Sequence, residues 1–287
     1  MSKVILITGA STGFGRDTAE TLARAGHKVF ASMRATKTKN RDHAVALSEQ
    51  NVEVIELDVT DTRSVDEAIA DVISKAGRID VLVNNAGVAS AGVSEAFTDA
   101  QVTALFDVNV VGLHRVTRAV LPTFRRQEDG LIINIGSILG RVTFPFFGIY
   151  GASKFAVEAM TDSLRREVSQ LGVDVTLIQP SAYPTQMYGS ADQPGDATRI
   201  ENYGPVGEIP GAMFQSFMTL FEGADAPKPH DIAEAISTLI ETPKGHRPAR
   251  TVVGTSFGAD TINDATLPVQ ISSIKALGLD HLEAVKL

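Results

Sequence analysis

The sequence predicts a doubly wound α/β fold, in which helices cover both faces of a mostly parallel central sheet. Short runs rich in Val, Ile and Leu alternate along the chain with longer stretches whose apolar residues recur at helical spacing. The short runs are apolar on both faces, which is typical of parallel strands buried between two layers of helices. We therefore expect right-handed crossover connections between the strands.

The predicted elements follow one another in regular order. The runs expected as strands are 4–7, 29–31, 52–57, 79–83, 131–135 and 173–178. The helical patterns between them cover 14–25, 41–50, 62–76, 99–127 and 149–171. Gly26 is typical of a left-handed cap at the C-terminus of the first predicted helix. Thr60 and Asp61 are typical of an N-cap for the predicted helix at 62–76. We find no clear linker, so residues 1–287 are predicted to form a single domain.

The composition excludes several classes of function. The net charge of -8 offers no basic face for nucleic acid. The absence of cysteine excludes disulfides, thiolate metal sites and a cysteine nucleophile. The histidines show no metal-ligand spacing, so we expect no metal. No signal peptide and no run of ~18 apolar residues is found, which predicts a soluble, cytoplasmic protein without membrane contact.

Residues 184–229 do not follow the regular alternation of strand and helix patterns. This segment is rich in Gly, Pro, Met, Phe and Tyr, and contains one helical pattern at 212–221. A long insertion in a compact domain is usually functional or disordered, and disordered segments are poor in aromatic residues. We therefore expect a lid over a substrate site; the alternative is a surface helix packed permanently on the core.

The stretch TGASTGFG at residues 8–15 suggests a phosphate site. It follows a buried strand and opens a helix, where backbone N–H groups and the helix dipole favour an anion. Side chains at Gly9, Gly13 and Gly15 would obstruct a pyrophosphate in that turn. The spacing T-G-x-x-x-G-x-G differs from the commoner G-x-G-x-x-G. Ser11 and Phe14, in the same turn, belong to the predicted cofactor site.

The end of the second predicted strand bears on the choice of cofactor. An NAD site usually has an acidic residue there for the ribose 2′-hydroxyl, whereas an arginine accommodates the 2′-phosphate of NADP. No acid lies between His27 and Asn40, and Arg34 follows the strand. We therefore expect NADP, with NAD as the alternative.

Tyr150 and Lys154 stand one helical turn apart in Tyr-Gly-Ala-Ser-Lys. This spacing brings both side chains to one helix face, where the ammonium is expected to lower the pKa of the phenol below ~10. Such a tyrosine can exchange a proton with an alcohol or carbonyl. Ser137 follows the fifth strand and can donate to the same oxygen. Asn109 lies among valines and needs a polar partner.

Together these residues resemble the short-chain dehydrogenases/reductases, in their single-domain branch with a Rossmann fold. The resemblance covers residues 3 to 185. The matching positions, in family order, are Thr8-Gly9, Gly13, Gly15, Asp58-Val59, Asn84-Asn85-Ala86-Gly87, Asn109, Ser137, Tyr150 and Lys154.

The resemblance implies a role for each of these residues. Tyr150 would be the general acid/base, Lys154 would lower its pKa and hold the nicotinamide ribose, and Ser137 would orient the substrate oxygen. Asn109 would bind a water that relays protons from Lys154. Other roles follow the same family pattern: Asp58 and Val59 contact adenine, while Asn85, Ala86 and Gly87 line the cofactor and brace the sheet.

One stretch departs from the family pattern, Pro-Gly-x-x-x-Thr. Here Pro180 and Thr185 match, but Ser181 replaces the glycine. Pro180 and Thr185 remain in the predicted cofactor site, with Thr185 bonded to the carboxamide. Tyr183 and Pro184 are expected to reshape the pocket floor.

The predicted function is transfer of a hydride between NADP(H) and a secondary alcohol or ketone. Aromatic residues and the Phe/Met-rich insertion favour an apolar small-molecule substrate. The alternatives are a dinucleotide-binding sensor without catalysis, which should have lost a residue of the triad, and a lyase, which should have lost the glycine turn or the lysine. The resemblance also implies a homodimer or homotetramer, and the apolar stretch 267–287 could join an interface or cover the pocket.

Overall fold

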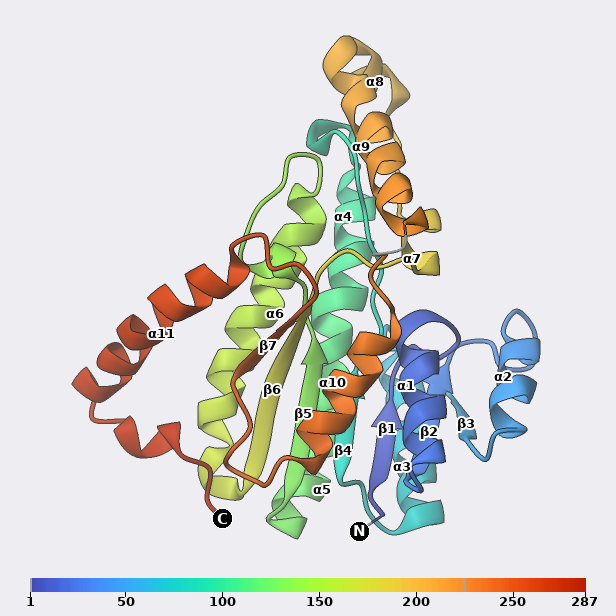
Figure 1. Ribbon diagram of the computed structural model, residues 1–287. Coiled ribbons are helices and arrows are strands. Elements are labelled where there is room, and N and C mark those ends of the chain that lie inside the picture. Colours follow the sequence, from blue (N-terminus) through green and yellow to red (C-terminus); the bar gives the residue numbers. More distant parts are fainter. Residues whose placement is uncertain (1, 224–225) are drawn as a thin grey trace.

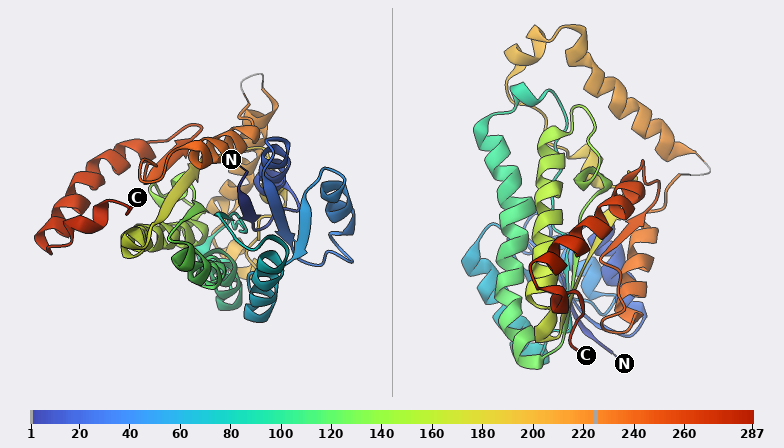
Figure 2. Two further views of the ribbon diagram at one scale, coloured as in Figure 1. Left: turned by 90° about the horizontal axis from the view of Figure 1, so that it is seen from below. Right: turned by 90° about the vertical axis from the view of Figure 1, so that its left-hand side faces the viewer.

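The structure is a computed structural model that describes residues 2–223 and 226–287 (Figure 1). Met1 and residues 224–225, which fall inside the expected 184–229 insertion, lie outside the described part. The described residues form a seven-stranded sheet in which every neighbouring pair is parallel. Helices cover both faces of this sheet (Figure 2), so the predicted fold class is confirmed.

The first six strands correspond to the runs predicted from the sequence. The strands are β1 (Val4–Ile7), β2 (Lys28–Met33), β3 (Glu53–Glu56), β4 (Val81–Asn84), β5 (Gly130–Ile135), β6 (Val173–Pro180) and β7 (Arg250–Val253). β7 was not predicted. It has four residues, each only partly buried, so its apolar run is too short to stand out.

The helices agree with the predicted patterns, with two differences. They are α1 (Gly13–Arg24), α2 (Arg41–Ser48), α3 (Thr62–Ala76), α4 (Asp99–Phe106), α5 (Leu113–Gln127), α6 (Gly148–Glu167), α7 (Gln186–Gly189), α8 (Ala197–Asn202), α9 (Pro205–Glu222), α10 (His230–Glu241) and α11 (Ala259–Ala276). The pattern at 99–127 is not one α-helix, because the π-helical segment Asp107–Gly112 separates α4 from α5. α7, α8, α10 and α11 were not predicted.

The strand order places a ligand crevice next to β1. The order is β3-β2-β1-β4-β5-β6-β7, so the chain winds one way from β1 to β3 and the other way from β4 onward. Ile5 pairs with Val29 on one side and with Val81 on the other. In open sheets of this kind, ligands bind beyond the carboxyl ends of the strands where the order reverses.

Two apolar layers hold the helices on the sheet. On one face, Leu22 of α1 and Ile236 of α10 pack with Ile5 and Ile7 of β1. On the other face, Val72 of α3 and α5 residues pack with Leu6 and Ile132. Both apolar layers include residues of β1 and β4, the strands on either side of the crevice. Helices therefore support these strands from both faces of the sheet.

The insertion stands above the carboxyl ends of the strands, at the end of the molecule opposite the two termini (Figure 1). The helical pattern expected at 212–221 lies within α9, which is longer and begins at Pro205. Although α9 is rich in apolar residues, none of its residues is buried. Among the residues that the structure describes, no helix is both long and apolar enough to cross a bilayer.

Candidate active site

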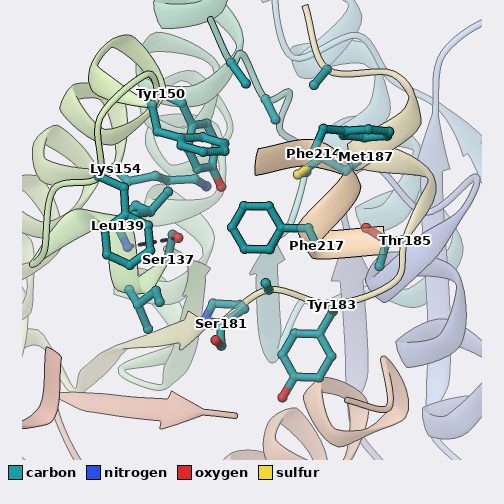
Figure 3. A pocket seen from close by; sticks show the side chains of 18 of the residues that line it. Ser137, Leu139, Tyr150, Lys154, Ser181, Tyr183, Thr185, Met187, Phe214 and Phe217 are labelled. Carbon is teal, nitrogen blue, oxygen red and sulfur yellow. Dashed lines mark hydrogen bonds between the residues drawn. The ribbon is translucent and has the colours of Figure 1, made fainter. Parts of the chain in front are cut away.

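A cavity of about 440 Å³ lies between the carboxyl ends of the strands and the insertion (Figure 3). The glycine turn contributes Phe14 to its wall, and α6 contributes Tyr150 and Lys154. The ends of β4, β5 and β6 and the apolar side of α9 complete it. The cavity therefore joins the predicted cofactor site to the predicted catalytic residues.

The glycine turn lacks side chains at Gly9, Gly13 and Gly15 for two different reasons. A Cβ atom on Gly9 would lie 2.7 Å from Cα of Ala86, and one on Gly15 would lie 2.6 Å from the carbonyl oxygen of Gly9. These two glycines are thus required by contacts within the protein, not only by a ligand as the sequence suggested. Gly13 has a positive φ of 56°, and its nearest neighbour is Cβ of Thr185 at 3.8 Å. Gly13 therefore faces the more open side of the turn, where α1 begins.

The Asn-Ala-Gly stretch after β4 braces this turn. The side-chain nitrogen of Asn85 donates to the carbonyl oxygens of Thr8 and Gly9 at 2.9 and 3.0 Å. The Thr8 hydroxyl oxygen accepts from the backbone N–H groups of Asn85 and Ala86, both at 3.0 Å. Thr8 was noted only as part of the motif, and the structure shows that it ties β1 to the end of β4.

Tyr150, Lys154 and Ser137 meet at the base of the cavity (Figure 3). Lys154 Nζ lies 5.6 Å from the centre of the Tyr150 ring and donates to the carbonyl oxygen of Ile135 at 2.9 Å. The Ser137 side chain lies close enough to the Tyr150 phenol to favour its ionised form. The structure therefore brings these three side chains together, as the sequence predicted.

The pKa of the phenol differs from the expectation. Burial raises the pKa of Tyr150 to about 12, because desolvation disfavours the phenolate more than the Ser137 hydrogen bond favours it. Burial likewise lowers the pKa of Lys154 to about 8. The sequence argument considered only the attraction between the two groups and left out the desolvation of both.

Asn109 lies in the π-helical segment, and its side chain is already fully engaged. Its Oδ1 accepts from the N–H of Val88 at 2.8 Å, and its Nδ2 donates to the Val88 carbonyl oxygen at 2.9 Å and to Ser153 Oγ at 3.1 Å. Ser153 Oγ in turn donates to the carbonyl oxygen of Tyr150. The amide therefore braces the start of α6. The water-relay role stays a prediction, and Ser153 is a bracing residue that sequence reasoning missed.

The residues predicted to hold the adenosine end lie at the ends of β2 and β3. Arg34 is 62% exposed along its side chain, and its guanidinium lies 3.8 Å from Oδ2 of Asp58. The other carboxylate oxygen of Asp58 accepts from the N–H and hydroxyl of Thr60. Val59 is buried in the apolar layer, and its carbonyl oxygen accepts from Arg115. Any adenine contact by Val59 would therefore come from its backbone or the edge of its side chain.

The stretch that departs from the family pattern forms one wall of the cavity. Pro180, Ser181 and Thr185 line it, and the Ser181 N–H donates to the carbonyl oxygen of Val253 on β7. Tyr183, expected to reshape the pocket floor, lines the cavity, while its buried ring also packs edge-to-face on Phe14 at 5.5 Å (Figure 3). Phe14 and Tyr183 together form this part of the wall.

The remaining walls of the cavity are mainly apolar, with Gln193 and Gln215 as polar exceptions. Phe217 of α9 points into its centre (Figure 3) and packs edge-to-face on Phe147 at 6.2 Å. Phe144 packs in the same way on Phe257 at 5.6 Å. Phe257 follows β7 and was missed by sequence reasoning, because nothing local connects it with a site more than 100 residues earlier in the chain.

The histidines and carboxylates do not converge elsewhere. Within the described ranges, no group of three or more His, Asp or Glu side chains is placed to hold a metal ion. Ser11 lies in the glycine turn beside the predicted phosphate site.

Comparison with known protein sequences gives the following similarities. A family model described as short chain dehydrogenase matches residues 3–195. The 17-beta-hydroxysteroid dehydrogenase type 1 of Homo sapiens is 34% identical over 252 residues, which are 84% of this chain and 75% of that protein. The 3-ketodihydrosphingosine reductase of Bacteroides thetaiotaomicron is 39% identical over 183 residues, 64% of this chain. The match spans 65% of the latter protein, just under two thirds of its length.

Solved structures have the same fold. A short-chain dehydrogenase from Streptomyces avermitilis has a TM-score of 0.78 and 31% identity, with 97% of both chains covered. An alcohol dehydrogenase from Thermococcus sibiricus complexed with 5-hydroxy-NADP has a TM-score of 0.70 and 28% identity, covering 88% of this chain and 96% of that one. A Burkholderia phymatum short chain dehydrogenase/reductase in complex with NAD has a TM-score of 0.73 and 26% identity, covering 96% and 95%.

Proposed function

Since this chain belongs to the short-chain dehydrogenase/reductase family, we propose that it is an NADP(H)-dependent oxidoreductase acting on apolar secondary alcohols or ketones. Oxidoreductase chemistry on CH–OH or C=O groups with a nicotinamide cofactor is common to the family and its neighbours. The observation that carries the finer proposal is the meeting of Ser137, Tyr150 and Lys154 at the base of a mainly apolar cavity.

The residues present fit a nicotinamide dinucleotide. Gly13 faces the open side of the turn at the start of α1, where backbone N–H groups suit a pyrophosphate. Arg34 and Asp58 lie together at the adenosine end, and Pro180 and Thr185 line the cavity at the nicotinamide end. When bound, the cofactor supplies or accepts the hydride.

The side chains of the chain itself handle the proton. In the direction of ketone reduction, Tyr150 donates its hydroxyl proton to the carbonyl oxygen, and its high pKa keeps it protonated at neutral pH. Ser137 donates a hydrogen bond to the same oxygen and so orients the substrate. Lys154 places a positive charge beside the phenolate as it forms, because below about pH 8 its amine is protonated.

The preference for NADP rests on Arg34. No acidic side chain of β2 competes for the ribose hydroxyl, and the exposed guanidinium is free to meet a 2′-phosphate. Asp58 is the nearest carboxylate, and it already accepts two hydrogen bonds from Thr60. NAD is the alternative, and the similar structures include complexes with each kind of cofactor.

The substrate class rests on the walls of the cavity. Phe144, Phe147, Phe214 and Phe217 surround the space in front of Tyr150, and Lys154 is the only lining residue with a charged side chain among those described. An uncharged aryl, alicyclic or steroid-like ketone suits such walls. The printed names of two relatives, a hydroxysteroid dehydrogenase and a ketodihydrosphingosine reductase, favour apolar substrates as well.

Three further features are proposals of the same kind. Residues 184–229 act as a lid of a single domain, since α9 covers the cavity without being buried. The chain forms a homodimer or homotetramer, because Val111 and Phe155 expose apolar side chains on the stretches that the resemblance assigns to subunit contacts. A cytoplasmic location is predicted from the sequence alone.

The competing function is a dinucleotide-binding sensor without catalysis. It has the same glycine turn but needs no proton donor, so the complete set of Ser137, Tyr150 and Lys154 argues against it. A lyase on the same scaffold is disfavoured by the intact glycine turn and by Lys154.

The first experiment is to follow reduced nicotinamide absorbance with purified protein, apolar ketones, and NADPH or NADH in parallel. Faster oxidation of NADPH than of NADH supports both the reaction and the role of Arg34. No oxidation of either, together with tight NADPH binding in a titration, would favour the sensor. No binding of either cofactor would contradict the interpretation of the glycine turn.

A further inference from the structure

A buried ionic network lies directly behind the turn that carries Ser137. The Glu158 carboxylate of α6 accepts from Arg141 at 3.0 Å and from Nε of Arg250 at 2.8 Å. Its other oxygen accepts from Gln179 of β6. Asp162, one turn further along α6, pairs with Arg250. The network therefore joins α6, β6 and β7 to the residue that ends the Ser137 turn.

The network shares a helix face with the catalytic residues. Tyr150, Lys154 and Glu158 follow one another at intervals of four residues on α6, and all three are buried. The Ser137 turn lies on the same face: a Cβ atom on Gly140 would be 3.0 Å from the carbonyl oxygen of Lys154 and 2.9 Å from Cγ of Glu158. This turn thus rests on α6 between the catalytic lysine and the carboxylate.

The turn is short enough to transmit the position of Arg141 to Ser137. Residues 138–140 form a single 3₁₀ turn, in which the Gly140 N–H donates to the Ser137 carbonyl oxygen and the Arg141 N–H to that of Ile138, both at 2.9 Å. Ser137 Oγ accepts from the Leu139 N–H at 3.1 Å. Only the three residues of this turn separate Ser137 from Arg141, whose guanidinium is held by Glu158.

A second network on the same helix lacks this connection. Arg165, near the end of α6, pairs with the buried Asp174 at 3.2 Å, and Asp174 also pairs with Arg247 at 3.0 Å. Arg165 and Arg141 are similarly buried, with 17% and 16% of their side chains exposed. In both networks the carboxylate keeps a second arginine when the first is removed, so the two sites form a matched pair.

We propose that Arg141 and Glu158 are positioning residues, which hold the Ser137 hydroxyl against Tyr150 and the substrate oxygen. Buried ion pairs contribute little net stability, because desolvation offsets most of their attraction. Their effect here is on geometry: the pair clamps the end of the Ser137 turn onto the helix that carries Tyr150. This inference rests on the proposed reaction.

The test compares Arg141→Met with the control Arg165→Met. Each variant removes one buried guanidinium and leaves the carboxylate paired. We expect Arg141→Met to lower kcat by about 10-fold to 100-fold, as displacement of a catalytic group does, with NADPH affinity changed by less than about 2-fold. Arg165→Met should lose similar stability but keep kcat, and Arg141→Lys should recover part of the turnover. Equal losses of kcat in Arg141→Met and Arg165→Met would overturn the proposal.

A double-mutant cycle with Ser137→Ala tests whether Arg141 acts through Ser137. In the Ser137→Ala background, Arg141→Met should cause little further loss of kcat, because the hydroxyl that it positions is already gone. Fully multiplicative losses would contradict the proposal. If Arg141→Met does not fold, the isosteric Glu158→Gln takes its place in the same cycle.

Crystal structures of Arg141→Met and Arg165→Met separate this inference from the proposed function. The Ser137 hydroxyl should move away from the Tyr150 phenol only in Arg141→Met, and an unchanged Ser137 position there would overturn the positioning role even if no substrate is known. An inactive wild-type protein would instead contradict the proposed function.

Discussion

The ammonium nitrogen of Lys154 lies 5.6 Å from the centre of the Tyr150 ring and donates to the carbonyl oxygen of Ile135. Both side chains are buried, so desolvation shifts their pKa values toward the neutral forms, to about 12 for Tyr150 and about 8 for Lys154. In the proposed mechanism, the reaction starts from a protonated phenol beside an amine whose pKa lies near physiological pH.

The shifted Lys154 should make stability depend on pH. Its pKa is about 8 in the folded protein and 10.5 ordinarily, so between these values the folded state holds fewer protons than the unfolded state. Stability therefore rises with pH in that window, as the cost of the buried charge is removed. We expect the free energy of unfolding of the wild type, relative to Lys154→Met, to be constant below about pH 7 and to rise above about pH 8, measured by urea denaturation without nucleotide.

The control for this measurement is Lys275→Met, which removes an exposed lysine from α11. It should show no such change. The difference in free energy of unfolding between the wild type and Lys154→Met could instead stay constant up to pH 10.5. That result would mean that Lys154 keeps its ordinary pKa of 10.5.

Replacing Tyr150 by Phe should remove the proton donor and leave the cavity in place. We expect kcat to fall by ~10²–10⁴-fold, the usual effect of losing a general acid, while NADPH affinity stays within about 2-fold. Tyr183→Phe is the control, because it removes a hydroxyl from a ring that is turned into the core. Unchanged turnover in Tyr150→Phe would contradict the mechanism.

Replacing Arg34 by Asp should move cofactor preference toward NADH. The new carboxylate repels a 2′-phosphate and can accept from a ribose hydroxyl, so the ratio of kcat/KM for NADPH to that for NADH should fall by about 10-fold or more. Arg125→Asp makes the same charge change on an exposed residue near the end of α5 and should leave the ratio unaltered. An unaltered ratio in Arg34→Asp as well would contradict the role assigned to this arginine.

Truncating Phe217 should weaken binding of bulky apolar ketones. Its ring lies in the centre of the cavity and packs on Phe147, so loss of this apolar contact should raise KM by about 10-fold, equivalent to ~1.4 kcal/mol. Leu220→Ala is the matched control on the same helix, because Leu220 is 60% exposed. Equal KM values for wild type and Phe217→Ala would show that α9 does not contact the substrate.

The elements predicted correctly share strong local signals. The strand at 4–7 is a continuous apolar run, and the one at 131–135 is interrupted only by Asn134. The Tyr150–Lys154 spacing places both side chains on one helix face whatever lies around them. β7 lacks such a signal, since its four residues are only partly buried. It becomes a strand because β6 offers an unpaired edge to it.

The errors concern side chains whose surroundings come from distant parts of the chain. The pKa of Tyr150 was expected to fall, but burial raises it to about 12. Gly9 and Gly15 were attributed to the ligand alone, although Ala86 and the turn itself already exclude a side chain there.

By itself, the sequence determined the layered fold, the position of the glycine turn and the placing of Tyr150 and Lys154 on one helix face, because periodicity and local spacing carry that information. Only the tertiary structure decided the protonation tendencies, the apolar walls from Phe217 and Phe257, and the clamp of Arg141 on Glu158. These properties depend on desolvation and on contacts between residues far apart in the chain, which exist only once the layers have packed.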